Sequence, residues 1–255
     1  MNTVYSEIKK SNEIINVTQE TARRLIKDVR NIVRHPLADN GIYYVHDDSD
    51  MFKGVAMVIG PSDTIYSHGF YFFTFDFPSD YPHSPPKVTY HTNDGVVRFH
   101  PNLYRNGKVC LSILNTWQGE QWSACQSLRS VLLTLVTLFH NKPLLCEPGI
   151  KETHKHFQHY NEIIEYKNWE VACFGMINKK FLNQRFLVFE PFIFKHFFDN
   201  KQKISESLEK LKVKNHTHTI CDIYYKDYIE LDYAKLYDLY LIVASNVISR
   251  FTDKQ

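Results

Sequence analysis

The sequence predicts an α+β protein in which a four-stranded antiparallel meander follows an amphipathic helix, precedes a second helix and is continued by an α-helical extension. Three observations predict this architecture. Short runs of β-branched and aromatic residues follow one another between residues 42 and 91. Their connections are too short for crossover helices, which favours antiparallel neighbours. From about residue 151 onward, long helical periods replace the strand pattern.

The first predicted helix covers residues 18–34. Thr18 is a suitable N-cap, and the pair His35-Pro36 ends the helix because the residue before proline disfavours the helical region. One face is apolar, and the opposite face is basic. The basic residues are Arg23, Arg24, Lys27, Arg30 and Arg34. Such a row is usually a solvated face, and a docking surface is the alternative.

Four strands and a second helix follow. The strands are expected at Ile42–Val45, Phe52–Ile59, Phe70–Phe77 and Lys87–His91. The third strand has aromatic residues on both faces, which predicts a central strand that is covered on both sides. The second helix is expected from Gln126 to Asn141, where Pro143 stops it.

The rest of the chain is expected to be helical. Residues 160–178 and 233–251 show the clearest helical periods, and these helices are expected to pack on the first domain or on each other. The predicted organisation is an N-terminal segment (1–17), a core domain (18–150) and a helical extension (151–255) that packs on or next to the core. The extension either stabilises the fold or restricts the choice of partners.

Bulk composition excludes several classes of protein. Of the 255 residues, 44% are hydrophobic, which supports a packed core rather than disorder. A formal net charge of +2 gives no strong field for nucleic acid, and no apolar run is long enough to span a bilayer. Neither nucleic acid nor a membrane is therefore expected as a partner. The N-terminus mixes charged residues and lacks an apolar stretch, so no signal peptide is expected.

The cysteines and histidines give no metal-binding pattern. The five cysteines are an odd number without C-x-x-C spacing, which favours reduced thiols and an intracellular location, cytoplasmic and/or nuclear. His154, His156 and His159 are closely spaced, but one helical face does not hold all three. We expect these histidines to be exposed to solvent, and we expect no metal.

The segment HPNLYRNGKVCLSIL (100–114) places Cys110 after a turn. Asn106-Gly107 favours a tight turn with positive φ at both residues, which leaves residues 108–111 extended beside the loop 98–104. Such a cysteine is most often structural, and a nucleophile near a polar loop is the alternative. Asn102 carries an amide that donates either to a loop carbonyl or to a developing oxyanion.

This segment resembles the active-site signature of ubiquitin-conjugating enzymes, the E2 family, in which seven residues separate H-P-N from the acceptor cysteine. Other segments resemble the family in the same order: GPSDTIYSHGFYFFTFDF, YPHSPPKVTY and Trp122-Ser123 before the second helix. The likeness covers residues 18–150 and implies the UBC fold. Ser112, the TWQGEQW loop and Glu147-Pro148-Gly149 resemble the type Z branch and its giant apoptosis-inhibitor-linked relatives. The pattern from Tyr160 to Phe251 resembles, more weakly, the type Z helical extension.

The resemblance implies an enzyme that accepts ubiquitin or a ubiquitin-like modifier from an E1 activating enzyme as a thioester on Cys110. The modifier would then pass to a substrate lysine or to an E3 ligase. Asn102 would stabilise the oxyanion or the loop, and His100 would order the loop. Glu147 would orient the incoming lysine at the gate of the site, and a solvated loop carboxylate is the alternative. No cofactor is implied, because the E1 consumes the ATP.

The resemblance also indicates surfaces for partners. Arg23, Arg24, Lys27 and Arg30 are the candidates for docking the E1. His83 and Ala124 lie in two loops that family members use to bind E3 ligases. They stand where the family has an aromatic residue and a proline, respectively, and this weakens the expectation of binding to ordinary ligases. Cys125 and Cys146 do not match the acceptor position and are expected to be structural thiols.

Two other functions stay open from the sequence. The first is a catalytically silent E2 variant that only binds within the ubiquitin system, against which the presence of Cys110 and Asn102 argues. The second is a cysteine hydrolase that uses Cys110 and His100. No third residue that would orient the histidine is evident in the sequence.

Overall fold

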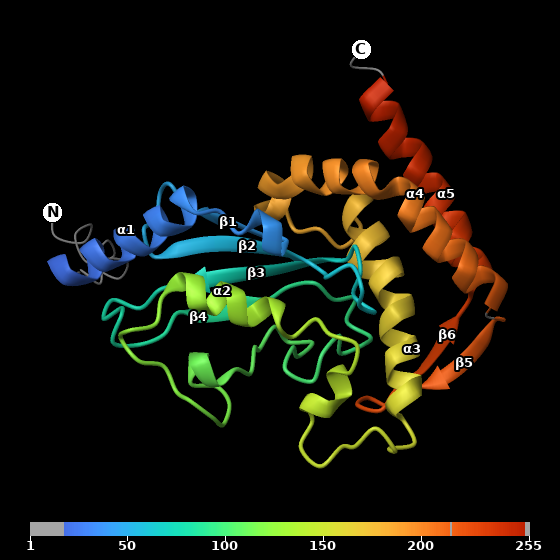
Figure 1. Ribbon diagram of the computed structural model, residues 1–255, viewed down its shortest axis with the longest axis horizontal. Coiled ribbons are helices and arrows are strands. Elements are labelled where there is room, and N and C mark those ends of the chain that lie inside the picture. Colours follow the sequence, from blue (N-terminus) through green and yellow to red (C-terminus); the bar gives the residue numbers. More distant parts are fainter. Residues whose placement is uncertain (1–17, 215, 253–255) are drawn as a thin grey trace, which may run out of the picture.

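The computed structural model describes residues 18–214 and 216–252, so the predicted N-terminal segment, residues 1–17, lies outside the described residues. The core contains helix α1, four strands and helix α2. Their bounds are α1 Gln19–Arg34, β1 Ile42–His46, β2 Lys53–Ile59, β3 Phe70–Asp76, β4 Lys87–Tyr90 and α2 Leu128–Val136. The strands form one antiparallel sheet in the order β1-β2-β3-β4, which confirms the predicted meander (Figure 1).

Helix α1 begins and ends as the sequence predicts. The Thr18 side chain accepts a hydrogen bond from the Thr21 backbone N–H at 3.1 Å, and His35 caps the last turn. Helix α2 is shorter than predicted. Ser127 and Ser130 form a capping box at its start, and the helix ends at Val136 rather than at Asn141. Beyond this end, Phe139 turns inward and stacks on Tyr71, with ring centroids 4.2 Å apart.

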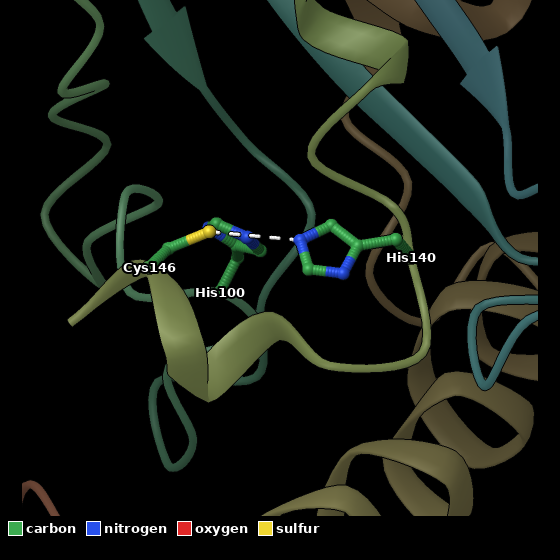
Figure 2. A group of neighbouring side chains, drawn as sticks. All are labelled: His100, His140 and Cys146. Carbon is green, nitrogen blue, oxygen red and sulfur yellow. Dashed lines mark hydrogen bonds between the residues drawn. The ribbon is translucent and has the colours of Figure 1, made fainter. Parts of the chain in front are cut away.

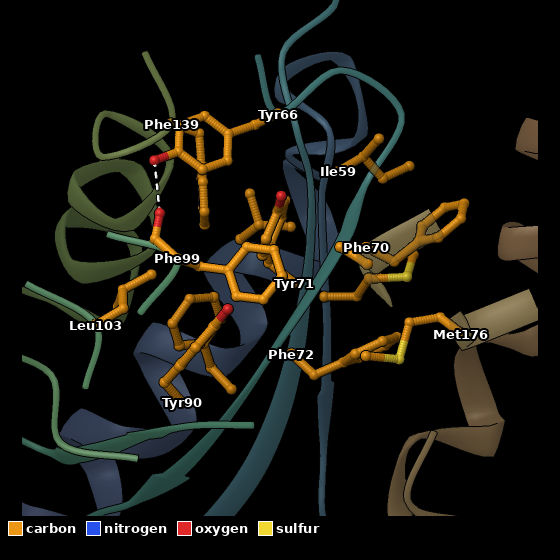
Figure 3. Packing of buried hydrophobic residues seen from close by; sticks show 14 of the residues in the cluster. Ile59, Tyr66, Phe70, Tyr71, Phe72, Tyr90, Phe99, Leu103, Phe139 and Met176 are labelled. Carbon is orange, nitrogen blue, oxygen red and sulfur yellow. Dashed lines mark hydrogen bonds between the residues drawn. The ribbon is translucent and has the colours of Figure 1, made fainter. Parts of the chain in front are cut away.

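Strand β3 is the centre of the molecule. Its residues from Phe70 to Phe75 are all buried, which confirms a strand that is covered on both faces. Because neighbouring side chains of a strand point to opposite faces, Tyr71 meets Phe139 from the α2 side, while Phe72 meets Phe186 from the extension at a ring distance of 4.8 Å. Figure 3 shows this packing around Tyr71, with Met176 on the extension side.

The described part of the extension contains three α-helices, a 3-10 helix Gln184–Phe189 and a hairpin. Their bounds are α3 Phe157–Lys167, which continues as a π-helical segment Asn168–Gly175, α4 Glu190–Lys214, β5 His218–Cys221, β6 Tyr228–Leu231 and α5 Tyr233–Thr252. The two predicted helices correspond to α3 with its continuation and to α5. The expectation that strand signals end at residue 151 is wrong for the hairpin. Its strands have four residues each and bury only Ile220, Ile229 and Leu231, so each strand is too short to give a clear period in the sequence.

Polar groups join the extension to the core. Asn168 is fully buried; its Oδ1 accepts a hydrogen bond from the Tyr71 hydroxyl at 2.6 Å, and its Nδ2 donates to the Ser67 carbonyl at 2.8 Å. The Tyr160 hydroxyl donates to the Arg98 carbonyl at 2.7 Å. Because buried polar groups are costly when unpaired, these bonds fix α3 and its continuation against β3, the segment before β3 and the loop after β4. Within the described residues, no helix has the length and apolarity to cross a membrane.

A histidine pair across the same interface, of which His68 is buried and His196 partly buried, predicts acid sensitivity. His68, before β3, and His196, in α4, share a hydrogen bond of 3.0 Å. Burial, aided by His196 and Lys203, lowers the pKa of His68 to about 4. The unfolded chain therefore binds more protons between about pH 6.5 and pH 4, and the free energy of unfolding falls as the pH falls through this window.

We expect His68 alone to remove about 1–3 kcal/mol of stability between pH 7 and pH 4. Urea unfolding at a series of pH values measures this loss. His68→Asn removes the titrating ring and should flatten the pH dependence of the free energy of unfolding. Asparagine is chosen because it tolerates the φ of +60° at this position. A dependence of unchanged steepness in the variant would assign the acid sensitivity to other groups.

Candidate active site

The turn before Cys110 differs in one respect from the prediction. Gly107 has a φ of +88°, whereas Asn106 does not have a positive φ, so only one of the two residues is left-handed. A Cβ at Gly107 would lie 2.8 Å from a methyl carbon of Thr89, which excludes larger residues there. After this turn, residues 108 and 109 pair with Thr89 and Leu103. Cys110 thus follows an extended segment beside the loop 98–104.

Asn102 holds this loop to the cysteine. The backbone N–H of Cys110 donates to the Asn102 carbonyl at 2.9 Å, and the side-chain Nδ2 of Asn102 donates to the Cys110 carbonyl at 2.6 Å. Its buried Oδ1 has no partner among the described residues. In this conformation the side-chain amide of Asn102 stabilises the loop. A role toward an oxyanion stays a prediction, since the same Nδ2 would have to turn from the carbonyl of Cys110 to the reacting centre.

His100 is buried and neutral. Burial, together with His140 and Arg98, lowers its pKa well below the ordinary value of histidine. Its Nδ1 accepts a hydrogen bond from the Asn102 backbone N–H at 3.0 Å, so the proton of the neutral ring is on Nε2. The ring therefore has no free lone pair for general-base chemistry. This geometry agrees with a loop-ordering role, in which His100 positions Asn102.

Cys110 itself is only 1% exposed, and the described residues provide no hydrogen bond to its sulfur. A partner protein can reach this sulfur only if neighbouring groups move. The other thiols differ in exposure: Cys125 is exposed, Cys146 is partly buried and Cys173 is fully buried. Burial also raises the pKa of the Cys173 thiol, so this thiol stays protonated at neutral pH.

This burial predicts an order of alkylation. In the native protein, iodoacetamide should modify Cys125 first and Cys110 at least about tenfold more slowly, because only fluctuations expose the Cys110 sulfur. Peptide mass spectrometry over time measures both rates, and Cys173 in the same sample reports any global unfolding. Modification of Cys110 ahead of Cys125 would contradict the closed conformation described above.

His100 belongs to a cluster of three side chains that the sequence does not predict. The side-chain donor atoms of His100, His140 and Cys146 lie within 4.8 Å of one another (Figure 2). Cys146 is the last residue of the short helical turn Pro143–Cys146, and His140 lies three residues before this turn. The Nε2 atom of His140 and the Sγ atom of Cys146 are 3.6 Å apart. His100 comes from a separate segment forty residues earlier, so sequence spacing gives no signal for the group.

The ring tautomers in this group do not suit a metal ion. The Nδ1 of His140, like that of His100, accepts a backbone N–H, here from Lys142 at 3.1 Å. Both neutral rings therefore carry a proton on Nε2, whereas a metal requires a lone pair. Burial also raises the pKa of the Cys146 thiol, which disfavours the thiolate that binds metals. We interpret Cys146 as a packed thiol that accepts a hydrogen bond from His140.

Glu147 follows Cys146 directly and is partly buried. Its Oε2 accepts a hydrogen bond from the hydroxyl of Tyr224 at 2.9 Å. Tyr224 belongs to the turn between β5 and β6, seventy-seven residues away. The alternative of a merely solvated carboxylate at Glu147 is therefore wrong for this structure. A role toward an incoming lysine stays a prediction.

The predicted E1-docking residues lie on α1 but are not equivalent. Arg23, Lys27 and Arg30 are exposed. Arg24 is engaged within the chain: its guanidinium donates to the carbonyls of Ala124 and Gln126 and pairs with Asp28 at 3.2 Å. In this structure Arg24 ties α1 to the loop before α2, and its role in docking the E1 stays a prediction.

The two predicted ligase-loop residues lie on neighbouring loops. His83 and Ala124 are both exposed. The indole N–H of Trp122 donates to the Pro82 carbonyl at 2.7 Å, and its ring is 5.9 Å from that of Tyr81. One surface therefore contains both positions. Of the predicted exposed histidines, His159 is exposed, whereas His154 and His156 are partly buried.

Comparisons with known proteins agree with the family resemblance of the sequence. The profile of the family described as ubiquitin-conjugating enzyme matches residues 24–172. Ubiquitin-conjugating enzyme E2 Z of Danio rerio is 42% identical over 167 residues, which cover 64% of this chain and 50% of that protein. The human E2 Z is 43% identical over 161 residues, which cover 62% and 45%, respectively.

A human protein named dual E2 ubiquitin-conjugating enzyme/E3 ubiquitin-protein ligase BIRC6 is 38% identical over 156 residues. This match covers 58% of the chain and 3% of that protein. The chain thus spans about half the length of the type Z relatives and a small part of the giant one. The comparisons support the predicted type Z branch, and the family match runs from residue 24 to residue 172, past the predicted end of the core at residue 150.

Proposed function

Because the chain belongs to the ubiquitin-conjugating enzyme family, in the branch that contains the type Z enzymes, we propose that it is an E2 transferase that carries ubiquitin or a ubiquitin-like modifier as a thioester on Cys110. The observation that carries this proposal is the reciprocal pairing of Asn102 and Cys110, which holds the acceptor cysteine against the His100–Asn102 loop.

The first chemical step is a thioester exchange. The Cys110 thiolate attacks the carbonyl carbon of the modifier's C-terminal thioester on the E1, a new C–S bond forms, and the E1 cysteine leaves as a thiolate. In the second step an unprotonated lysine amine attacks the Cys110 thioester. The C–N bond forms, the proton of the amine goes to solvent or to a nearby base, and the Cys110 thiolate leaves. Both steps pass through an oxyanion that needs hydrogen-bond donors.

The roles of the neighbouring residues follow from this chemistry. Asn102 would keep the loop in place before transfer and offer its Nδ2 to the oxyanion once the carbonyl of Cys110 releases it. Glu147 would orient the lysine amine by accepting its N–H groups. His100 would fix the position of Asn102 and take no part in proton transfer, because its Nδ1 is occupied.

The proposed partners are a modifier, an E1, substrate proteins and, with less support, E3 ligases. The E1 would dock on the exposed basic residues Arg23, Lys27 and Arg30 of α1, and ligases would dock on the surface around His83 and Ala124. The chain would need no cofactor of its own, since the E1 uses the ATP. Five unpaired cysteines support an intracellular location, cytoplasmic and/or nuclear.

A charging assay tests the proposal. Purified protein is incubated with ATP, ubiquitin or a related modifier, and a panel of E1 enzymes, and is resolved with and without reductant. A reductant-sensitive adduct is the expected result. If no adduct forms, the burial of Cys110 favours a binding module without transferase activity. Cleavage of a ubiquitin fusion without any E1 would instead indicate the hydrolase.

A further inference from the structure

The turn between β5 and β6, residues 222–227, packs on residues 98–110 of the core, which we call the acceptor loop because they lead to Cys110. We call it the hairpin turn. Asp222 is buried and organises the turn, because its Oδ2 accepts the backbone N–H groups of Tyr224 and Tyr225 at 2.9 and 2.7 Å. Figure 1 shows the β5–β6 hairpin at the end of the extension beside α3. A part of the extension therefore reaches the site that the core provides.

Two arginines of the acceptor loop bind the tyrosines of the hairpin turn. The guanidinium of Arg98 lies between two rings, 3.5 Å from the centroid of Tyr104 and 4.5 Å from that of Tyr224. The guanidinium of Arg105 lies 3.8 Å from the ring of Tyr225. Arg98 also donates to the Pro101 carbonyl, next to Asn102. These cation–π contacts join the hairpin turn to the loop that holds Cys110.

The hydroxyl of Tyr224 completes the connection by donating to Glu147 Oε2 at 2.9 Å. Burial, followed by the charge of Glu147, raises the pKa of Tyr224 above its ordinary value. The phenol is therefore a neutral donor throughout the physiological range. A hydrogen bond from such a donor restricts the rotation of the carboxylate and fixes one of its two oxygens.

We propose that Tyr224 is a positioning residue of the transferase site: it holds the carboxylate of Glu147 in the orientation that receives the substrate lysine. The inference rests on the proposed function. It assigns the hairpin turn to the wall of the active site, which makes the extension a part of the catalytic unit. Oε2 is held by Tyr224, and Oε1 is left to accept N–H groups of the incoming amine.

The test separates charging from discharge. The full chain is charged with ubiquitin, ATP is removed, and loss of the thioester is followed at increasing concentrations of free lysine and, separately, of hydroxylamine. Hydroxylamine is a small, strong nucleophile that attacks a thioester without being held in place by a carboxylate. Tyr224→Phe should charge like the wild type and keep the ring contacts with Arg98. Its maximal discharge rate to lysine should fall roughly tenfold, while discharge to hydroxylamine stays within about twofold.

Two variants show whether Tyr224 acts through Glu147. In a Glu147→Gln background, the Tyr224→Phe change should slow discharge to lysine by less than about twofold, because nothing is left to position. Tyr228→Phe is the matched control, since Tyr228 lies at the end of the same hairpin and is 78% exposed. It should leave both reactions unchanged.

Each other outcome counts against the inference. Equal slowing toward lysine and hydroxylamine, or a full tenfold effect in the Glu147→Gln background, would indicate a structural role and overturn it. Normal charging with unchanged discharge in Tyr224→Phe would overturn the inference alone. A wild-type chain that does not charge with any E1 would overturn the proposed function, and the inference with it.

Discussion

Replacing Cys110 with alanine is expected to abolish the reductant-sensitive adduct, lowering its yield by roughly a thousandfold or more. The thiol supplies the sulfur of the thioester, and no other described side chain stands at the acceptor position beside Asn102. Cys110→Ser should instead give an adduct that forms more slowly and resists reductant, because the hydroxyl forms an oxygen ester. Gel analysis with and without reductant distinguishes the two results.

The controls must separate chemistry from folding, because Cys110 is buried. Removing the sulfur leaves a small cavity that costs about 1 kcal/mol, so both variants should unfold close to the wild type in a thermal scan. Cys125→Ser is the matched change at an exposed thiol and should charge normally. An adduct that survives in Cys110→Ala and disappears in Cys125→Ser or Cys146→Ser would transfer the acceptor role to another cysteine.

The core was predictable because its signals are local. Helix α1 has a side-chain cap at Thr18 and a proline after His35, and β3 has an aromatic residue at nearly every position. The end of α2 was misjudged for a tertiary reason. Leu138 and Phe139 continue the helical period of the sequence, but Phe139 gains more by stacking on Tyr71 than by prolonging the helix.

The environment of the acceptor site was only partly predictable. Cys110, Asn102 and His100 stand close together in the sequence, and their spacing shows the motif. Tyr224, which contacts both Glu147 and Arg98, comes from a turn more than seventy residues away, and no local pattern marks it as their neighbour. Likewise, the charge of Arg24 suggested a docking role, whereas its bonds to two backbone carbonyls exist only in the folded chain.

Removing the extension is expected to unfold the core. A chain that ends at residue 150 would expose Phe70 and Phe72, which are buried under the extension, and would leave the Tyr71 hydroxyl without its acceptor. Each aromatic side chain contributes about 1.5–3 kcal/mol by burial, and a typical domain is stable by only about 5–15 kcal/mol. We therefore expect an insoluble or unfolded product, judged by expression, circular dichroism and gel filtration.

A point change tests the same interface in the full chain. Asn168→Ala removes the acceptor of the buried Tyr71 hydroxyl and the donor to the Ser67 carbonyl, which should cost about 2–4 kcal/mol in urea unfolding. Asn161→Ala is the matched control in α3, because its bond to the Asn141 carbonyl is exposed, and it should cost less than about 1 kcal/mol.

The pairing of Asn168 with Tyr71 can be separated from the loss of volume. Tyr71→Phe should cost less in the Asn168→Ala background than in the wild type, because its hydroxyl has already lost its acceptor. Strict additivity would mean that the two residues act independently and that the extension is held by apolar packing alone. A soluble, cooperatively folded chain of residues 1–150 would show instead that the second face of β3 tolerates solvent, and that the extension serves partner choice rather than the fold.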